Sequence, residues 1–401
     1  MDRRSFLKVT AASAAASMIP MASAKGMVME NLSSDDAELS RHRIVAIRHT
    51  RVRMRWPRFV GFNAQRGPHG TGPHVNMCSL ITDQGAEGLG ILRGSTENAN
   101  IAFEAIRGRS LSELFTISQG TLENRYMPFD FVFYDLAGVI LNKPVYEMLG
   151  SEKPILCRVY SGMIYFDEMD PVENPRGWDR LLENCQWDFN YGYRQFKLKI
   201  GRGYRFMPKD KGLKADIEAT RLVFDHFPDC DILVDANDGY ANAEEFIEYL
   251  KGIKNVPLFW IEEPFVENRV DNTKLKQWLL ANGRRNTLIA DGETRPNLEY
   301  CLEMGKEQIL DVYIENIRAL SFSHYRRLVP RLQERGMLMS PHVWGDTISA
   351  YYASQLIAAY GTAPTLSGCT CFSDEIDLKG YRIIRGCVVP PKSPGFGMRL
   401  L

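Results

Sequence analysis

The sequence predicts an α/β protein made of a (β/α) barrel with a smaller α+β domain in front of it. Its 401 residues are too many for one small core. From about residue 155 onward, short apolar runs alternate with amphipathic helical stretches, as in parallel strands joined by helices. Before that residue the pattern differs, with two longer strands, a tight turn and then helices. We therefore expect two domains in this order.

Residues 1–24 are predicted to be a signal peptide and not part of the fold. A charged start with Arg3-Arg4 is followed by a short apolar run and the small-x-small site Ala22-Ser23-Ala24, the pattern of a secretory signal. The arginine pair with Phe6-Leu7 resembles a twin-arginine signal, whose route exports folded proteins. The alternative is an uncleaved anchor, but the apolar run is shorter than the ~20 residues of a membrane span. We expect cleavage after Ala24, no stable membrane anchor afterwards, and a periplasmic protein.

Residues 25–153 are predicted to form the α+β domain. Its expected elements are antiparallel strands at Ile44–Arg55 and Val75–Thr82, a turn at Asp83-Gln84-Gly85 before the short run Gly88–Leu92, and a helix over Met127–Leu141. Residues 371–401 contain three prolines after Val389. We expect this last segment to fold back onto the α+β domain.

Residues 154–370 are predicted to form the barrel. Eight apolar runs of strand length lack alternating polarity, which is typical of parallel strands buried on both faces. They are Cys157–Gly162, Arg194–Ile200, Asp231–Ala236, Leu258–Glu263, Thr287–Gly292, Leu310–Asn316, Met337–Pro341 and Pro364–Ser367. Helical patterns such as Ala215–Phe227 and Asn242–Ile253 separate them, and the basic segment 202–214 is expected to be a solvated loop. A doubly wound open sheet is the alternative, but no Gly-x-Gly-x-x-Gly motif follows the first strand.

Composition argues against several classes of function. Forty-nine basic residues balance forty-nine acidic ones, so no net positive field is present to hold nucleic acid or an anionic membrane. The eight cysteines have no paired zinc spacing, and Cys369-x-Cys371 is the only close pair. We therefore expect neither nucleic-acid binding nor a disulfide scaffold.

Polar residues stand at the ends of successive predicted strands of the barrel. They are Lys197, Lys199, Asp235, Glu262, Glu293, Asn316 and His342. In a barrel of parallel strands these ends meet at one mouth, where catalytic residues are found. Any one of them alone could be an exposed loop residue, but a series of this length indicates a site.

Motifs around these residues resemble the enolase superfamily, in its branch of mandelate racemase and muconate lactonizing enzyme-like proteins. The matching segments are Phe196–Gly201, Val234–Asn237, Trp260–Pro264, Ala290–Glu293, Ser340–His342 and, before the barrel, Met127–Gly150. The resemblance covers nearly everything after about residue 40. It implies a (β/α)7β barrel of the TIM type with an N-terminal α+β capping domain, a substrate bound between the two, and a homo-oligomer.

Three carboxylates from successive strands, Asp235, Glu262 and Glu293, are predicted to bind Mg²⁺. They offer hard oxygen ligands without cysteine or histidine, and such ligands favour Mg²⁺ over zinc or copper. A divalent cation there can bind a substrate carboxylate and stabilise the anion that forms when an α-proton is lost. Asn237, Glu263, Asp291 and Asn316 are expected to contact these ligands or the substrate.

Lys197 and Lys199 are two residues apart on one strand and should share a face. Two neighbouring ammonium groups close to a dication should lower each other's pKa and free one to act as a base. The resemblance implies that Lys199 is this base, that Lys197 holds the substrate carboxylate, and that His342 acts on the opposite face as an acid or a base.

Two positions depart from the family pattern. An aspartate usually orients the histidine of the seventh strand, but here Asn316 occupies that place, with Glu315 before it. An asparagine cannot stabilise an imidazolium as a carboxylate does. The eighth strand ends in Leu366-Ser367-Gly368 without the acid that is common in this branch. His342 is therefore a weaker candidate for a base than for an acid, and a one-sided reaction is favoured over a two-base racemase.

The leading functional interpretation is a Mg²⁺-dependent lyase that removes an α-proton and then eliminates water from an acid sugar or related hydroxy-carboxylate. The alternatives are a racemase, epimerase or cycloisomerase that shares the first half-reaction, and a non-catalytic binding protein descended from such an enzyme. The substrate itself cannot be read from the sequence. The loop from about Arg55 to His74 contains five basic or titratable residues that could meet a second anionic group or simply lie on the surface: Arg55, Arg58, Arg66, His69 and His74.

Overall fold

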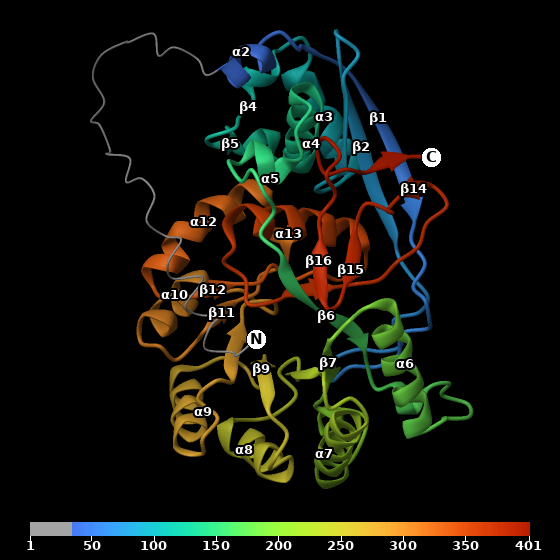
Figure 1. Cartoon of the computed structure of the whole chain (residues 1–401), viewed down its shortest axis with the longest axis vertical. Coiled ribbons are helices and arrows are strands. Elements are labelled where there is room, and N and C mark those ends of the chain that lie inside the picture. Colours follow the sequence, from blue (N-terminus) through green and yellow to red (C-terminus); the bar gives the residue numbers. More distant parts are fainter. Residues whose placement is uncertain (1–33) are drawn as a thin grey trace.

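The computed structural model describes residues 34–401 and shows two domains and a C-terminal segment that contacts both of them (Figure 1). The predicted signal peptide, residues 1–24, lies outside the described residues. Within residues 34–401, no helix combines the length and apolar character needed to span a membrane.

The N-terminal domain is built on a three-stranded antiparallel sheet. β1 (Ile44–Arg53) pairs along its length with β2 (His74–Thr82), which pairs with β3 (Glu87–Ile91). Helix α4 (Asp130–Leu141) packs on this sheet, and Gly88 permits the close approach, because a Cβ there would lie 2.4 Å from the Cβ of Leu136. The other elements of this domain are α2 (Ser34–Leu39), α3 (Thr96–Ile106), β4 (Phe115–Thr116), β5 (Gly120–Thr121) and α5 (Val145–Met148).

The barrel contains all eight predicted strands in parallel order, which confirms the predicted fold class. They are β6 (Cys157–Ile164), β7 (Gln195–Lys199), β8 (Asp231–Asp235), β9 (Leu258–Glu262), β10 (Leu288–Asp291), β11 (Val312–Tyr313), β12 (Leu338–Met339) and β13 (Leu366–Gly368). Pairing runs from β12 back to β6 in sequence order, and β13 pairs with β6. A hydrogen bond from the N–H of Met339 to the carbonyl of Thr362 joins the β12 and β13 sides and closes the ring. Large side chains such as Tyr160 and Trp260 fill the interior.

Helices surround the barrel on its outside (Figure 1). They are α6 (Trp178–Tyr191), α7 (Lys209–His226), α8 (Ala243–Gly252), α9 (Arg269–Ala281), α10 (Leu298–Lys306), α11 (Ile317–Leu320), α12 (Phe322–Glu334) and α13 (Thr347–Tyr360). The prediction of a solvated loop at residues 202–214 is wrong on two points. Helix α7 begins at Lys209, and Arg202 is buried, where it pairs with Glu168 and Asp216. A buried guanidinium requires such partners, and the sequence pattern does not show them.

The C-terminal segment, residues 371–401, contacts the capping domain as predicted and also the barrel. The N–H of Phe396 donates to Asp135 Oδ1 of α4 over 2.7 Å, and the Phe396 ring is fully buried. The segment also adds β16 (Cys387–Val389) antiparallel to the start of β6, with β15 (Arg382–Ile384) beside it. Its remaining strands, β14 (Ile376–Asp377) and β17 (Arg399–Leu400), pair with each other. One segment therefore joins both domains.

The connection between β1 and β2, residues 54–73, reaches the mouth of the barrel, and we call it the cap loop. Arg58 anchors it, because its guanidinium donates to both carboxylate oxygens of Asp188 over 2.8 and 2.7 Å. The indole N–H of Trp56 donates to the carbonyl of Gly345 over 2.9 Å, and the N–H of Phe166 donates to the carbonyl of Phe62 over 2.9 Å. These contacts fix the cap loop over the strand ends.

Candidate active site

A pocket of about 400 Å³ lies between the cap loop and the mouth of the barrel. The cap loop contributes Asn63, Gln65, Arg66 and His69, and the barrel contributes Lys197, Lys199, Asn237, Glu293, His342 and Trp344 among others. Predicted residues at the ends of four strands, β7, β8, β10 and β12, thus converge at one place, as the carboxyl ends of parallel barrel strands require.

The two lysines of β7 lie on one face and share a carboxylate. Lys197 Nζ lies 2.9 Å from Asp235 Oδ2 and 2.5 Å from Glu262 Oε1. Lys199 Nζ lies 2.5 Å from Asp235 Oδ2 and 2.9 Å from Asn237 Oδ1. The lysines and both acids are buried, and buried charges are tolerated only when they are paired in this way. The ammonium groups therefore neutralise the cluster of acids beneath the pocket.

The predicted mutual lowering of the lysine pKa values does not describe Lys197. Burial lowers the pKa of Lys197, but the carboxylates of Asp235 and Glu262 outweigh that effect and hold it well above the ordinary value. The expected lowering takes account of the neighbouring lysine only. The carboxylates of Asp235 and Glu262, which contact the lysines, have the opposite and larger effect. A lasting positive charge at Lys197 suits a group that holds a substrate carboxylate.

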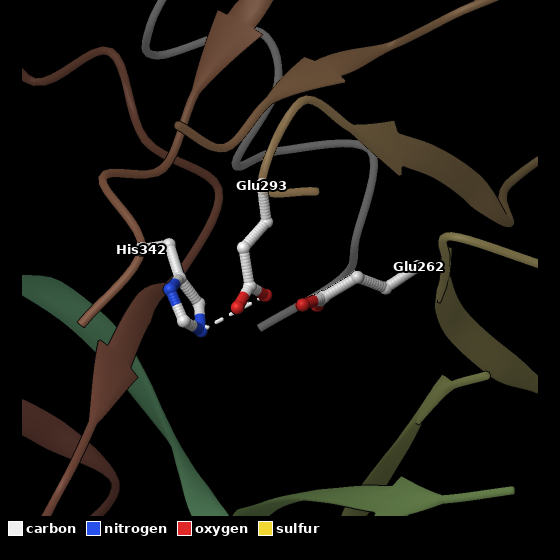
Figure 2. A group of neighbouring side chains, drawn as sticks. All are labelled: Glu262, Glu293 and His342. Atoms are coloured by element: carbon white, nitrogen blue, oxygen red, sulfur yellow. Dashed lines mark ion pairs between the residues drawn. The ribbon is translucent and has the colours of Figure 1, made fainter. Parts of the chain in front are cut away.

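Glu262, Glu293 and His342 form a compact group that can hold a cation. One ligand atom from each lies within 4.8 Å of the others, and Figure 2 shows the three side chains pointing toward one another. Glu262 Oε2 is buried and accepts no hydrogen bond, a costly state for a carboxylate oxygen. Burial and the charge of Asp235 raise the pKa of Glu262 to about 8. A hard divalent cation such as Mg²⁺ fits these oxygen donors.

Asp235, the third predicted metal ligand, lies outside that compact group. Its Oδ2 contacts both lysines, and its Oδ1 accepts the N–H of Asn237 over 3.0 Å. Asp235 is nevertheless joined to Glu262 through Lys197. Asp235 is thus next to this group, but His342 rather than Asp235 completes the closest set of possible ligands.

Asn316 determines how the imidazole of His342 is used. The Asn316 Oδ1 accepts the N–H of Arg318 over 2.9 Å, so its amide NH₂ faces His342 Nδ1, at 3.4 Å. An amide donor leaves Nδ1 as the acceptor and places the ring proton on Nε2, which lies 3.1 Å from Glu293 Oε2. Burial and the charges of Lys197 and Lys199 lower the pKa of His342 well below its ordinary value. His342 is thus a neutral ring with its N–H toward Glu293. Glu315 has a different partner, because it accepts from the hydroxyl of Tyr313.

The other predicted contact residues surround this centre. Asn237 joins it to the cap loop, since its side chain accepts from Lys199 and its carbonyl accepts from Gln65 Nε2 over 2.7 Å. Glu263 accepts from the N–H and the hydroxyl of Thr294 at 2.5 and 2.9 Å. Asp291 accepts the N–H of Gly292. Burial, with neighbouring acids, raises the pKa of both Glu263 and Asp291 well above the usual range. Neither of these two acids lines the pocket.

Sequence reasoning missed an aromatic wall of the pocket. Trp344 lies against His69 and Tyr165, with ring centroids 5.3 and 5.5 Å apart, and Trp56 packs behind it at 5.3 Å. Trp344 is only two residues beyond His342, but a tryptophan in a loop carries no signal of its own. His69 donates from Nδ1 to the carbonyl of Gly61, while burial lowers its pKa. The wall is therefore uncharged.

Solved structures similar to this one include two Geobacillus proteins. A galacturonate dehydratase with bound D-galacturonate and 5-keto-4-deoxy-D-galacturonate is 28% identical, with a TM-score of 0.82 over 90% of this chain and 95% of that one. A mandelate racemase/muconate lactonizing protein with magnesium and tartrate is also 28% identical, with a TM-score of 0.84 over 90% and 94%.

Similar curated proteins share shorter alignments. An o-succinylbenzoate synthase from Enterococcus faecalis is 25% identical over 233 residues, which are 55% of this chain and 57% of that protein, so the match spans little more than half of that relative. Other curated relatives include both a dehydratase and a racemase.

The family model for enolase C-terminal domain-like proteins matches residues 180–401, more than half of the chain. Those residues include β7 with its two lysines, the three carboxylates and His342. Together with the structural similarity over 90% of this chain, the match shows that this chain belongs to the enolase superfamily, in its mandelate racemase and muconate lactonizing enzyme-like branch.

Proposed function

We propose that this protein is a magnesium-dependent dehydratase of acid sugars or related hydroxy-carboxylates. The observation that carries the proposal is the asymmetry of the pocket. One side holds the paired Lys197 and Lys199, and the other holds His342 with its proton directed at Glu293 by Asn316. Such a site removes a proton from one face only. The 28% identity to a galacturonate dehydratase over nearly the whole chain supports this reaction class.

In this proposal Lys199 takes the proton α to the substrate carboxylate, and Lys197 holds that carboxylate. The β-hydroxyl then leaves and gains one proton to become water, which balances the proton that Lys199 took. The resulting enol becomes the 2-keto-3-deoxy acid. The N–H at His342 Nε2 would donate a hydrogen bond to the leaving hydroxyl and so assist its loss. Asn237 keeps Lys199 in place through its 2.9 Å contact.

Glu262, Glu293 and Asp235 are the residues that would hold magnesium. When bound, the cation supplies positive charge beside the carboxylate and so favours loss of the α-proton. Glu262 Oε2 is free of hydrogen bonds and ready to act as a ligand. Asp235 would exchange a lysine contact for the cation.

The direct test is proton NMR in deuterated water with Mg²⁺ and a panel of acid sugars. We expect loss of the α-proton signal together with a keto-deoxy product, and no reaction in excess EDTA. Exchange of the α-proton without loss of water would instead establish a racemase or epimerase, the alternative that the racemase relatives support. If no acid shows either α-proton exchange or a product, the protein would be a binding protein without enzymatic activity.

We also propose that the mature protein works in the periplasm. Residues 1–24 carry the signal that supports this proposal. Fractionation of cells should find the protein outside the cytoplasm with an N-terminus near Lys25. Export that survives the double change Arg3→Lys and Arg4→Lys would rule out the twin-arginine route.

A further inference from the structure

We propose that the substrate carries a second anionic group at the end away from the reacting carbon, and that Arg66 of the cap loop binds it. This inference rests on the proposed function, because it assumes that the first carboxylate is held at the barrel. It narrows the substrate from acid sugars in general to those with an acid at both ends, either a dicarboxylate or a phosphorylated acid.

The first argument is that Arg66 is the pocket cation without a protein partner. Lys197 and Lys199 are paired with Asp235 and Glu262. Among residues 34–401, the guanidinium of Arg66 makes no hydrogen bond or ion pair, although it lines the pocket. A guanidinium presents a planar fork of donors that matches carboxylate and phosphate oxygens.

The second argument comes from the other arginines near Arg66. Arg55 is paired with Asp374, and Arg58 is paired with Asp188. Arg205 reaches the cap loop from the barrel and donates to the carbonyl of Gln65 over 2.7 Å. Each of these three guanidinium groups already binds a protein acceptor. Arg66 differs from them because its guanidinium can bind a ligand without losing such a contact.

The third argument is that the backbone holds Arg66 in place before any ligand binds. The Asn63 side chain accepts the N–H groups of Gln65 and Arg66 over 3.0 and 2.7 Å. The Gln65 amide donates to the carbonyl of Asn237, which also contacts Lys199. The Arg66 backbone is therefore tied to the strand end that bears the chemistry. Such preorganisation reduces the entropy lost on binding.

The fourth argument is that Arg66 dominates the charge on its side of the pocket. Its neighbours there are the neutral His69, Trp344 and Asn63. A monoacid bound at the barrel would leave a cation facing hydroxyl groups only. An anionic group at the far end would pair with it.

The test is calorimetric binding to the Mg²⁺-loaded, full-length Lys199→Ala protein, so that no turnover occurs. In each of the galacto, gluco and manno series, the affinity for an aldonate is compared with that for its aldarate. A separate comparison sets 6-phosphogluconate against gluconate. We expect the second anion to improve affinity about 10- to 100-fold in at least one series. Tighter binding of the aldarates would show that the second anionic group is a carboxylate. Tighter binding of 6-phosphogluconate would show that it is a phosphate.

Adding Arg66→Gln should remove that preference and leave aldonate affinity within about twofold. Arg285→Gln is the matched control, since Arg285 is exposed just before β10, at the end of the barrel opposite the mouth. Equal binding of monoacids and diacids in every series, or no binding, overturns the proposal, as does a preference that survives Arg66→Gln. If monoacids are dehydrated while Arg66→Gln has no effect, this inference fails and the proposed function stands. If diacids bind through Arg66 but never lose an α-proton, the proposed function fails instead.

Discussion

The two walls of the pocket are built in different ways. On the barrel wall, each chemical group comes from a different strand, and the groups pair with one another: Lys197 with Glu262, Lys199 with Asp235, His342 with Glu293. On the cap wall, Asn63, Gln65, Arg66 and His69 come from one loop and are held mainly through backbone groups. On the barrel wall, replacing one of these side chains therefore leaves the group paired with it without that partner. On the cap wall, Arg66 can change its side chain without losing any of these contacts, whereas the others use the side chains of Asn63, Gln65 and His69.

The largest expected effect is on the barrel wall, at Glu262. Glu262→Ala removes the carboxylate with the free oxygen and leaves Lys197 with Asp235 alone, so both Mg²⁺ binding and activity should be lost. Calorimetric titration with Mg²⁺ and the deuterium-exchange assay would measure the two losses. Glu303→Gln, an exposed acid of α10, is the control and should behave as the unchanged protein. Full activity in Glu262→Ala would end the metal-site assignment.

The next largest effect is expected at Lys199, and comparison with His342 distinguishes the roles of the groups on the two faces of the substrate. Lys199→Ala should lose α-proton exchange by about 10²- to 10⁴-fold, the usual cost of removing a general base. His342→Asn should keep the exchange and slow only the loss of water. Both variants are measured by NMR on an acid that the unchanged protein turns over. The reverse outcome, with exchange lost in His342→Asn and kept in Lys199→Ala, would show that the faces are assigned wrongly.

A third prediction concerns how the cap wall is attached. Arg58→Met leaves Asp188 buried without its partner, and breaking a buried pair costs about 3–5 kcal/mol. Arg55, three residues before Arg58, forms an exposed pair with Asp374. Arg55→Met should cost much less stability, because solvent screens an exposed pair. Urea unfolding would measure both, and the two variants serve as each other's control. If both variants lose the same unfolding free energy, burial does not make the Arg58 pair more important for stability than the Arg55 pair.

The smallest effect is expected at Asn316. Asn316→Asp supplies an acceptor to His342 Nδ1, which should move the ring proton to Nδ1 and free Nε2. Nitrogen NMR of the imidazole would show the change directly. A several-fold gain in α-proton exchange from the His342 face should accompany it. An unchanged spectrum would mean that Asn316 does not set the proton position.

The sequence predicted the parts of the molecule that depend on local patterns and strand order. Eight apolar runs became eight parallel strands, and the polar residue at each end pointed to the mouth because barrel topology brings those ends together. Side chains whose roles depend on partners far away in the sequence could not be predicted. Arg202 was taken for a solvated cation because nothing local indicates Glu168, 34 residues earlier. The pKa of Lys197 was misjudged for the same reason, since Glu262 lies 65 residues away.

The C-terminal segment has a consequence for the order in which the protein is made. Phe396 fills the core beneath α4, and β16 pairs with the first barrel strand. These residues follow both domains in the chain, so neither domain can complete its core until they have left the ribosome. Truncated products therefore lack a finished fold.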